Sequence, residues 1–249
     1  MVKERSVVLR RYEYGDTSLV VVILTRGHGK VRFLARGARK PGSRMAGEFV
    51  TGHTGDIVYY EKEGRGLQLV REISGGPVVD TSAADLEKMC LLQAGLELAD
   101  RSTAEGETGP GAFDLLTGFM EALERAGDPY PVFFALEAGL LIEAGLMPRL
   151  ESCDSCGKVL AREQFSVNPS TGAVTCAECT PVEGGCLSPE GCEALRRLVR
   201  EGTEGAGAIR LGPELRGEIG RLLHRLFSHH VEGYRIPGAL RMLKGVERE

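Results

Sequence analysis

The sequence lacks any long apolar run. The longest uninterrupted one covers residues 19–24, and the apolar stretch 132–147 is broken by Glu137 and Glu143. Because about 20 consecutive apolar residues are needed to cross a bilayer, we expect no membrane-spanning segment. Residues 1–5 mix acidic and basic side chains and lack the apolar centre of a signal peptide. We therefore expect a cytoplasmic protein without a membrane partner.

Motifs that carry enzymatic chemistry are missing as well. The sequence contains no phosphate-binding G-x4-G-K-[ST] loop, no dinucleotide-binding G-x-G-x-x-G, no zinc-protease H-E-x-x-H and no nucleophile elbow G-x-S-x-G. His229 and His230 end a helical stretch, where a pair of histidines is more often structural than catalytic. These absences favour a binding protein over an enzyme.

The charge is unevenly distributed along the 249 residues, although the chain as a whole carries only −4. Residues 1–75 carry +6, residues 76–150 carry −9, and residues 151–249 carry −1. A chain of this length has room for about two domains. A basic module is therefore joined to an acidic one, and the low overall charge does not exclude a surface that binds a polyanion.

The N-terminal part reads as β-strands separated by glycine-containing turns. The segments SVVLRRYEY, SLVVVILT, VRFLARG, GDIVYYE and LQLVREI are short and rich in Val, Ile and Tyr. Five strands within about 75 residues favour a small OB-type barrel. We predict an α+β protein with an N-terminal five-stranded OB-fold β-barrel in residues 1–78.

The remaining residues, 79–249, are predicted to form an α-helical domain. Apolar residues recur at helical spacing in three stretches, the first of which is capped by Ser82 and carries Leu86, Met89, Cys90 and Leu96. The second ends before Pro129, and the third covers about 131–145. A fourth helix is predicted to begin at Ser188-Pro189, and a fifth to cover about 213–231.

Four of the seven cysteines form two C-x2-C pairs, Cys153 with Cys156 and Cys176 with Cys179. This spacing is typical of a zinc ribbon, in which each pair presents two thiolates and a hairpin brings the pairs together. QFSVNPSTGAVTC fits that hairpin. We predict an insert at 151–181 that holds one structural zinc ion, since four thiolates leave no open position for a substrate. A ribbon without metal and a redox pair are the alternatives.

The other cysteines are expected to be packed thiols. Cys90 lies on an apolar helix face, and Cys186 and Cys192 follow the ribbon. Cys186 is also a less favoured candidate for a replacement ligand.

The stretch ARGARKPGSR contains four cations and no acid. Its glycines and proline suit an exposed loop, and the segment 1–75 also contains six of the 14 aromatic residues, which could stack on bases. Each aromatic alone is more simply explained as strand core. We predict nucleic-acid contacts by seven basic residues, which are Arg10, Arg11, Arg32, Arg36, Arg39, Lys40 and Arg44.

These residues also carry a resemblance. GDTSLVVVILTRGHGKVRFLARGARKPGSRMAG, GRGLQLVREIS and LEAGLLIEAGLMPRLESCDSCG are similar to the corresponding segments of the RecO family of recombination mediators. The resemblance implies a DNA repair protein that binds single-stranded DNA, with duplex DNA left open, and anneals complementary strands. It also implies that the protein helps load a recombinase onto strands coated by single-stranded DNA-binding protein, together with RecR. The C-terminal GYRIPGALRML is only loosely similar.

Two alternatives stay open. An RNA-binding OB and zinc-ribbon protein of translation or transcription would use the same surface chemistry, and competition between DNA and RNA of equal length would separate the two. A zinc or thiol enzyme would need an open metal position or a thiol of lowered pKa, and the count of four thiolates argues against an open position.

Overall fold

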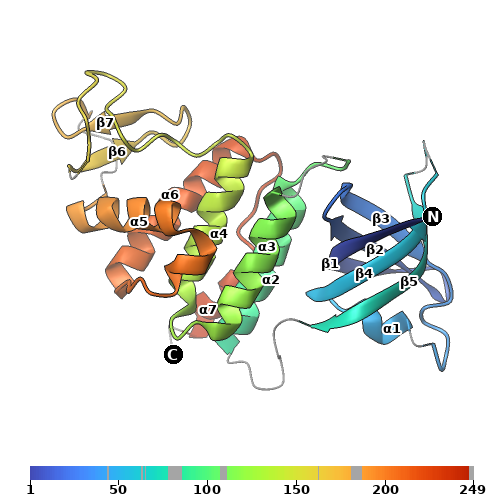
Figure 1. Ribbon diagram of the computed structural model, residues 1–249. Helices are drawn as coiled ribbons and strands as arrows, with labels where there is room; N and C mark the ends of the chain where they lie inside the picture. Colours follow the sequence, from blue (N-terminus) through green and yellow to red (C-terminus); the bar gives the residue numbers. More distant parts are fainter. Residues whose placement is uncertain are drawn as a thin grey trace. The chain divides into compact units, whose positions relative to one another are not determined.

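The computed structural model describes residues 1–43, 45–62, 64, 66–77, 86–106, 111–161, 163–180 and 187–246 (Figure 1). The chain divides into two compact units, one made of Met1–Glu124 with Pro237–Glu249 and the other of Arg125–Ile236. The predicted boundary after residue 78 separates the barrel from the helices within the first unit and stays a prediction. Among the described residues, no helix is long and apolar enough to cross a membrane.

Five strands of the first unit close into a barrel in the order β1-β2-β3-β5-β4. Strands β3 and β5 pair in parallel, and the other neighbours are antiparallel. This confirms the predicted five-stranded barrel. The strands and the short helix between β3 and β4 are β1 (Val2–Tyr14), β2 (Ser18–Thr25), β3 (Gly29–Ala35), α1 (Met45–Glu48), β4 (His53–Tyr60) and β5 (Gln68–Pro77).

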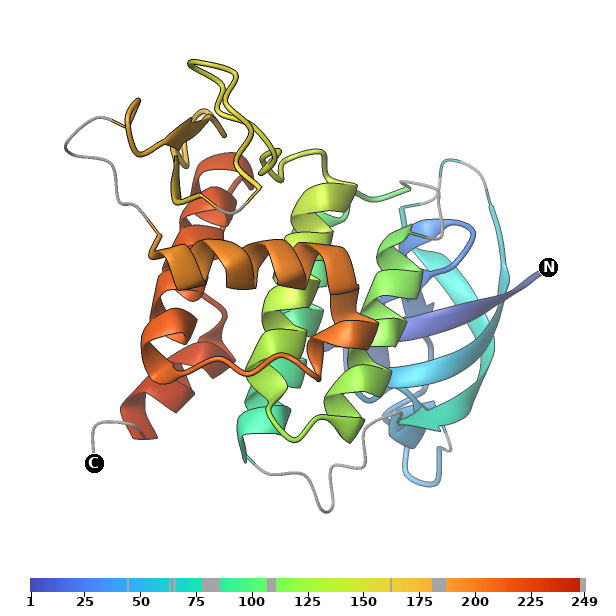
Figure 2. The same cartoon turned by 60° about the vertical axis from the view of Figure 1, so that its left-hand side comes forward.

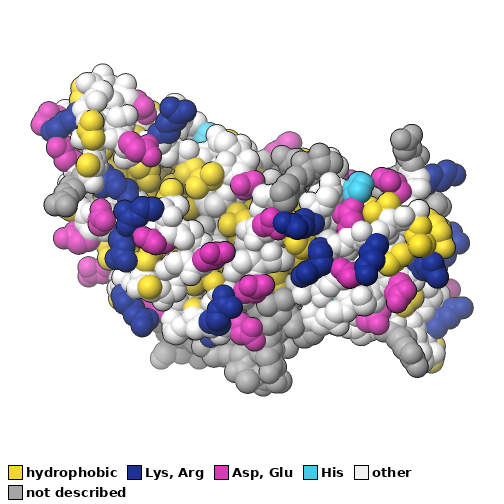
Figure 3. Space-filling view, in the orientation of Figure 1, with side chains coloured by type: hydrophobic (Ala, Val, Ile, Leu, Met, Phe, Trp, Pro, Cys, Tyr) yellow, Lys and Arg dark blue, Asp and Glu magenta, His cyan; other side chains and the backbone are white. Residues whose placement is uncertain are grey.

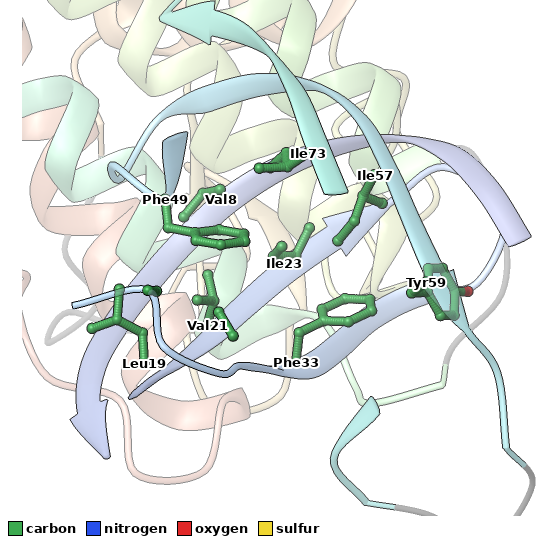
Figure 4. Packing of buried hydrophobic residues seen from close by; sticks show 11 residues of the cluster. Val8, Leu19, Val21, Ile23, Phe33, Phe49, Ile57, Tyr59 and Ile73 are labelled. Atoms are coloured by element: carbon green, nitrogen blue, oxygen red, sulfur yellow. The ribbon is translucent and has the colours of Figure 1, made fainter. Parts of the chain in front are cut away.

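Alternate residues of the strands fill the barrel (Figure 4). Strand β2 contributes Leu19, Val21 and Ile23, because alternate side chains of a strand point to the same face. The other face of β2 is buried as well. The rings of Phe33 and Tyr59 meet edge to face, with centroids 4.9 Å apart. Strands β4 and β5 approach closely at Gly55, where an added Cβ would lie 1.6 Å from the carbonyl oxygen of Ser74. Only glycine fits there.

Three helices complete the first unit, namely α2 (Leu86–Ser102), α3 (Gly111–Arg125) and α7 (Gly238–Val246), although the last residue of α3 falls in the second unit. Helix α2 carries all four apolar residues that predicted it, of which Cys90 and Leu96 are buried and Leu86 and Met89 are exposed. The helical cap expected at Ser82 lies outside the described residues. Helix α7 was not predicted, and the Gly238 N–H at its start donates to Glu97 of α2.

The second unit contains helices α4 to α6 and a small hairpin. Asp128 caps α4 by accepting from the Tyr130 N–H, and Ser188 caps α5 by accepting from the Gly191 N–H. Helix α5 lies against α4 and bends at Gly202, which has a φ of 61° (Figure 2). The elements are α4 (Pro129–Glu143), β6 (Phe165–Val167), β7 (Val174–Cys176), α5 (Pro189–Ala206) and α6 (Pro213–His230).

Candidate nucleic-acid interface and metal centre

The basic loop after β3, residues 36–44, is fixed to the barrel at its described residues. Ala38 is fully buried in the barrel core, and the Arg39 N–H donates to the carbonyl oxygen of Thr17 at 2.9 Å. Gly37 has a φ of +70°, and the Lys40 N–H closes the turn onto the Gly37 carbonyl. The loop therefore presents its side chains from an anchored backbone.

The cations of this loop differ in their surroundings. Arg36 and Lys40 are exposed, and neither has an ion pair within the described part of the chain. Arg39 pairs with Glu13 at 2.9 Å and donates to the Gly15 carbonyl at 3.3 Å. Arg44 lies outside the described residues. Arg36 and Lys40 are thus available to an anion, whereas Arg39 contributes to holding the loop.

The predicted contacts on the barrel strands have acidic neighbours that the sequence did not suggest. Arg10 and Lys30 both pair with Asp100, at 2.8 and 3.3 Å, and Arg32 pairs with Glu105. The side chain of Asp100 is only 11% exposed. Acids near the end of α2 therefore neutralise three cations of β1 and β3. Figure 3 shows the same mixing of basic and acidic side chains over this unit.

These charged residues line a groove of about 620 Å³. Arg11, another predicted contact, is exposed and lies beside them in the groove. Lys30 was missed by sequence reasoning, although its alternation with Arg32 along a strand places both on one face. The groove is lined by residues of both charges. The basic ones are Arg10, Arg11, Lys30, Arg32 and Arg101, and the acidic ones are Glu97, Asp100 and Glu105.

The aromatic residues of the barrel separate into two groups. Phe33, Phe49 and Tyr59 are buried in the barrel, as the simpler reading of each expected. Tyr12, Tyr14 and Tyr60 are 43%, 56% and 54% exposed. The rings of this second group are therefore reachable from solution.

The four cysteines of the two C-x2-C pairs come together in the second unit. Their sulfur atoms all lie within 4.8 Å of one another, and the Sγ atoms of Cys156 and Cys176 are 3.9 Å apart. Strands β6 and β7 form the predicted hairpin between the pairs. Asp154 links the first pair to β7, since it exchanges backbone and side-chain hydrogen bonds with Val174. The cluster is a plausible metal site.

Hydrogen bonds differentiate the four thiols. The Cys176 N–H donates to the sulfur of Cys153 at 3.3 Å and lowers the pKa of that thiol to about 6. The pKa of Cys179 is raised to about 12, chiefly because its thiol hydrogen-bonds with the Cys176 side chain. The lowered pKa favours the thiolate form of Cys153, and the thiolate is the form that ligates a metal.

The ribbon is tied to α5. The Arg196 guanidinium lies 4.9 Å from the ring centroid of Phe165 and donates to the carbonyl oxygens of Leu160 and Glu163. The Phe165 N–H donates to the sulfur of Cys192, which is fully buried, as is expected of a packed thiol. Cys186 lies outside the described residues.

Two family models match this chain, one over the barrel and the other over the helical part that carries the four cysteines. Residues 1–75 match the family model described as "Recombination protein O N terminal", and residues 83–237 match "Recombination protein O C terminal".

Curated relatives match over most of their length. The DNA repair protein RecO of Roseiflexus sp. (strain RS-1) is 32% identical over 99% of this chain and 86% of the relative. That of Anaeromyxobacter sp. (strain K) is 31% identical over 92% of this chain and 91% of the relative. The chain therefore belongs to the RecO family of DNA repair proteins, which are non-enzymatic recombination mediators.

Proposed function

We propose that the barrel of this chain binds single-stranded DNA, with Arg36 and Lys40 of the anchored loop contacting phosphates. The observation that carries the proposal is the exposure of these two cations on a fixed backbone, without ion pairs in the described residues. Arg10, Arg11 and Arg32 extend the basic surface along β1 and β3 once their acidic neighbours are displaced. Arg44 completes the loop's predicted contacts.

The biological activity that we propose is that of a recombination mediator. The protein anneals complementary strands and, together with RecR, helps load a recombinase onto strands coated by single-stranded DNA-binding protein. Family membership supports this role. A surface that binds phosphates without reading bases suits it, because annealing must proceed on any sequence.

We further propose that Cys153, Cys156, Cys176 and Cys179 hold one structural zinc ion. Zinc–sulfur bonds of about 2.3 Å in a tetrahedron place the sulfurs about 3.8 Å apart, and the Cys156–Cys176 separation is 3.9 Å. Four thiolates fill the coordination sphere, so the ion stabilises the ribbon and leaves no position for a substrate.

The experiment is an annealing assay on complementary strands coated with single-stranded DNA-binding protein, with and without RecR. We expect wild type to accelerate annealing and R36A/K40A to lose most of that acceleration. The matched control is R210A/R225A, which removes two exposed cations from the second unit. Equal losses in both variants would contradict the assignment, and so would tighter binding of RNA than of DNA of equal length.

A further inference from the structure

The last residues of β1 expose two tyrosines beyond the packed part of the strand. Val7, Val8 and Leu9 are buried, whereas every residue from 10 to 14 is exposed. Tyr12 is 43% exposed and Tyr14 is 56% exposed. Packing of the barrel core therefore does not account for these two aromatic rings.

The strand register places both tyrosines on the outer face of the barrel. Tyr12 pairs with Val20 and Tyr14 with Ser18, and residues directly opposite each other point to the same side of a sheet. The alternate residues of β2, Leu19 and Val21, belong to the core. The tyrosines therefore face outward.

The register also gives these rings basic neighbours on one side. Two pairings before Tyr12, and on the same face, Arg10 lies opposite Val22, which in turn lies opposite Arg32 of β3. The guanidinium carbon of Arg10 is 6.0 Å from the ring centroid of Tyr12. Arg10 of β1 and Arg32 of β3 thus lie on the same outer face as the two rings, on the side of Tyr12.

The basic loop leaves the barrel at the same end. The pairing of β2 with β3 ends at Leu19 and Ala35, next to Ser18, the partner of Tyr14. Arg39 then contacts Glu13, between the two tyrosines, and the Gly15 carbonyl in the following turn. Glu13 pairs with the core residue Leu19 and so faces the other side of the strand. The loop that carries Arg36 and Lys40 is therefore attached at the end of β1 that carries both rings.

The spacing of the tyrosines suits unpaired bases. Residues two apart on a strand are separated by about 6.6 Å, which is about twice the 3.4 Å rise per stacked nucleotide. A base therefore has room between the two side chains. Every base has a π-face, so stacking of this kind tolerates any sequence.

We propose that Tyr12 and Tyr14 form a stacking platform for unpaired nucleobases, next to the phosphate contacts of the basic loop. The platform rests on the proposed DNA-binding function and specifies its substrate class. A duplex keeps its base faces stacked inside and cannot use the rings. Single strands gain the stacking contribution in addition to the phosphate contacts, and duplexes do not.

The experiment measures equilibrium binding of four proteins to three ligands at one salt concentration. The proteins are wild type, Y12A/Y14A, Y12F/Y14F and Y60A, and the ligands are a single strand, an abasic single strand of equal length and a duplex. Tyr60 is a matched control, because it is equally exposed but lies on β4, which pairs with the opposite end of β1. Circular dichroism first confirms that each variant is folded.

At about 1 kcal/mol for each stacking ring replaced by alanine, the lower end of the usual range, loss of both rings should weaken single-strand binding about 30-fold. We expect Y12A/Y14A to show that loss, and to bind the abasic strand and the duplex as wild type does. Y12F/Y14F and Y60A should keep wild-type affinity for all three ligands.

Two results would overturn the platform. One is a folded Y12A/Y14A that binds the single strand as tightly as wild type, and the other is a variant that loses affinity equally for the strands with and without bases. Failure of the underlying DNA-binding function looks different, because wild type itself would then bind none of the three ligands.

Because the sequence contains no tryptophan, Tyr12→Trp provides a single emitter at the platform. Its fluorescence should be quenched by the single strand and not by the abasic strand. Unchanged emission at saturating single strand would contradict stacking at this position.

Discussion

Replacing Glu137 with glutamine should make the stability of the protein less dependent on pH. Glu137 lies within α4 and is 2% exposed, and its Oε2 has no hydrogen-bond partner among the described residues. Burial raises the pKa of this carboxyl from 4.5 to about 8. The folded protein therefore holds a neutral acid at neutral pH, whereas the unfolded chain is ionised there.

The direction of the effect follows from the raised pKa. Below about pH 4.5 both states are protonated, and this group's contribution to the free energy of unfolding is highest. As pH rises from 4.5 to about 8, the unfolded chain loses the proton while the folded protein keeps it, so stability falls. The pKa of Glu137 differs by about 3.5 between the folded and unfolded states, which at about 1.36 kcal/mol per pH unit changes the free energy of unfolding by about 5 kcal/mol.

The assay is calorimetric unfolding of the full chain between pH 5 and pH 9. We expect the free energy of unfolding of Glu137→Gln to rise by up to about 5 kcal/mol relative to wild type across this range, which for a chain of this length is roughly 10–20 °C in melting temperature. Glu143→Gln is the control, since Glu143 is exposed on the same helix. A constant difference between Glu137→Gln and wild type over the whole range would refute the reasoning, because it would mean that Glu137 is ionised in a satisfied site.

Three further predictions concern the first unit and the ribbon. D100N/E105Q frees the barrel cations from their acidic neighbours, so single-strand binding should tighten and the slope of log affinity against log salt should steepen by up to about 2. An unchanged slope in a salt titration would show that Asp100 and Glu105 do not weaken DNA binding. Cys153→Ser should abolish the one equivalent of zinc found by elemental analysis and lower the stability of the ribbon, while the barrel still binds DNA; a zinc-free wild type would rule the site out. Burial lowers the pKa of His53, so the stability that this residue contributes is present above about pH 6.5 and is lost as pH falls below that value. Between pH 7 and pH 5, denaturation of His53→Gln should therefore show a smaller loss of stability than denaturation of wild type. An equal loss of stability in the two proteins would contradict this prediction.

The barrel was predictable because its determinants are local. Strand β2 was predicted with the same bounds that the structure has, since a run of β-branched residues ends at glycine turns on both sides. The C-x2-C pairs were likewise recognisable, because each pair is a single turn of backbone. Their spacing alone predicted the hairpin that brings Cys156 and Cys176 together.

What the sequence could not show depends on contacts between distant residues. Nothing near Arg10 predicts an ion pair with Asp100, which lies 90 positions later and on a helix. Periodicity predicted the helix α2 but could not say which of its apolar residues pack, and Leu86 and Met89 at its start are exposed. Helix α7 is short, and its packing on α2 depends on a return of the chain that no local pattern records.

The most direct test of DNA binding by the barrel is the salt dependence of single-strand affinity in wild type and R36A/K40A. If each cation neutralises one phosphate, the slope of log affinity against log salt should flatten by about 1.4, at about 0.7 per contact. Between 50 and 200 mM salt, the affinity of the variant should then change about seven-fold less than that of wild type. A folded R36A/K40A with the wild-type affinity and slope would show that the loop does not hold DNA.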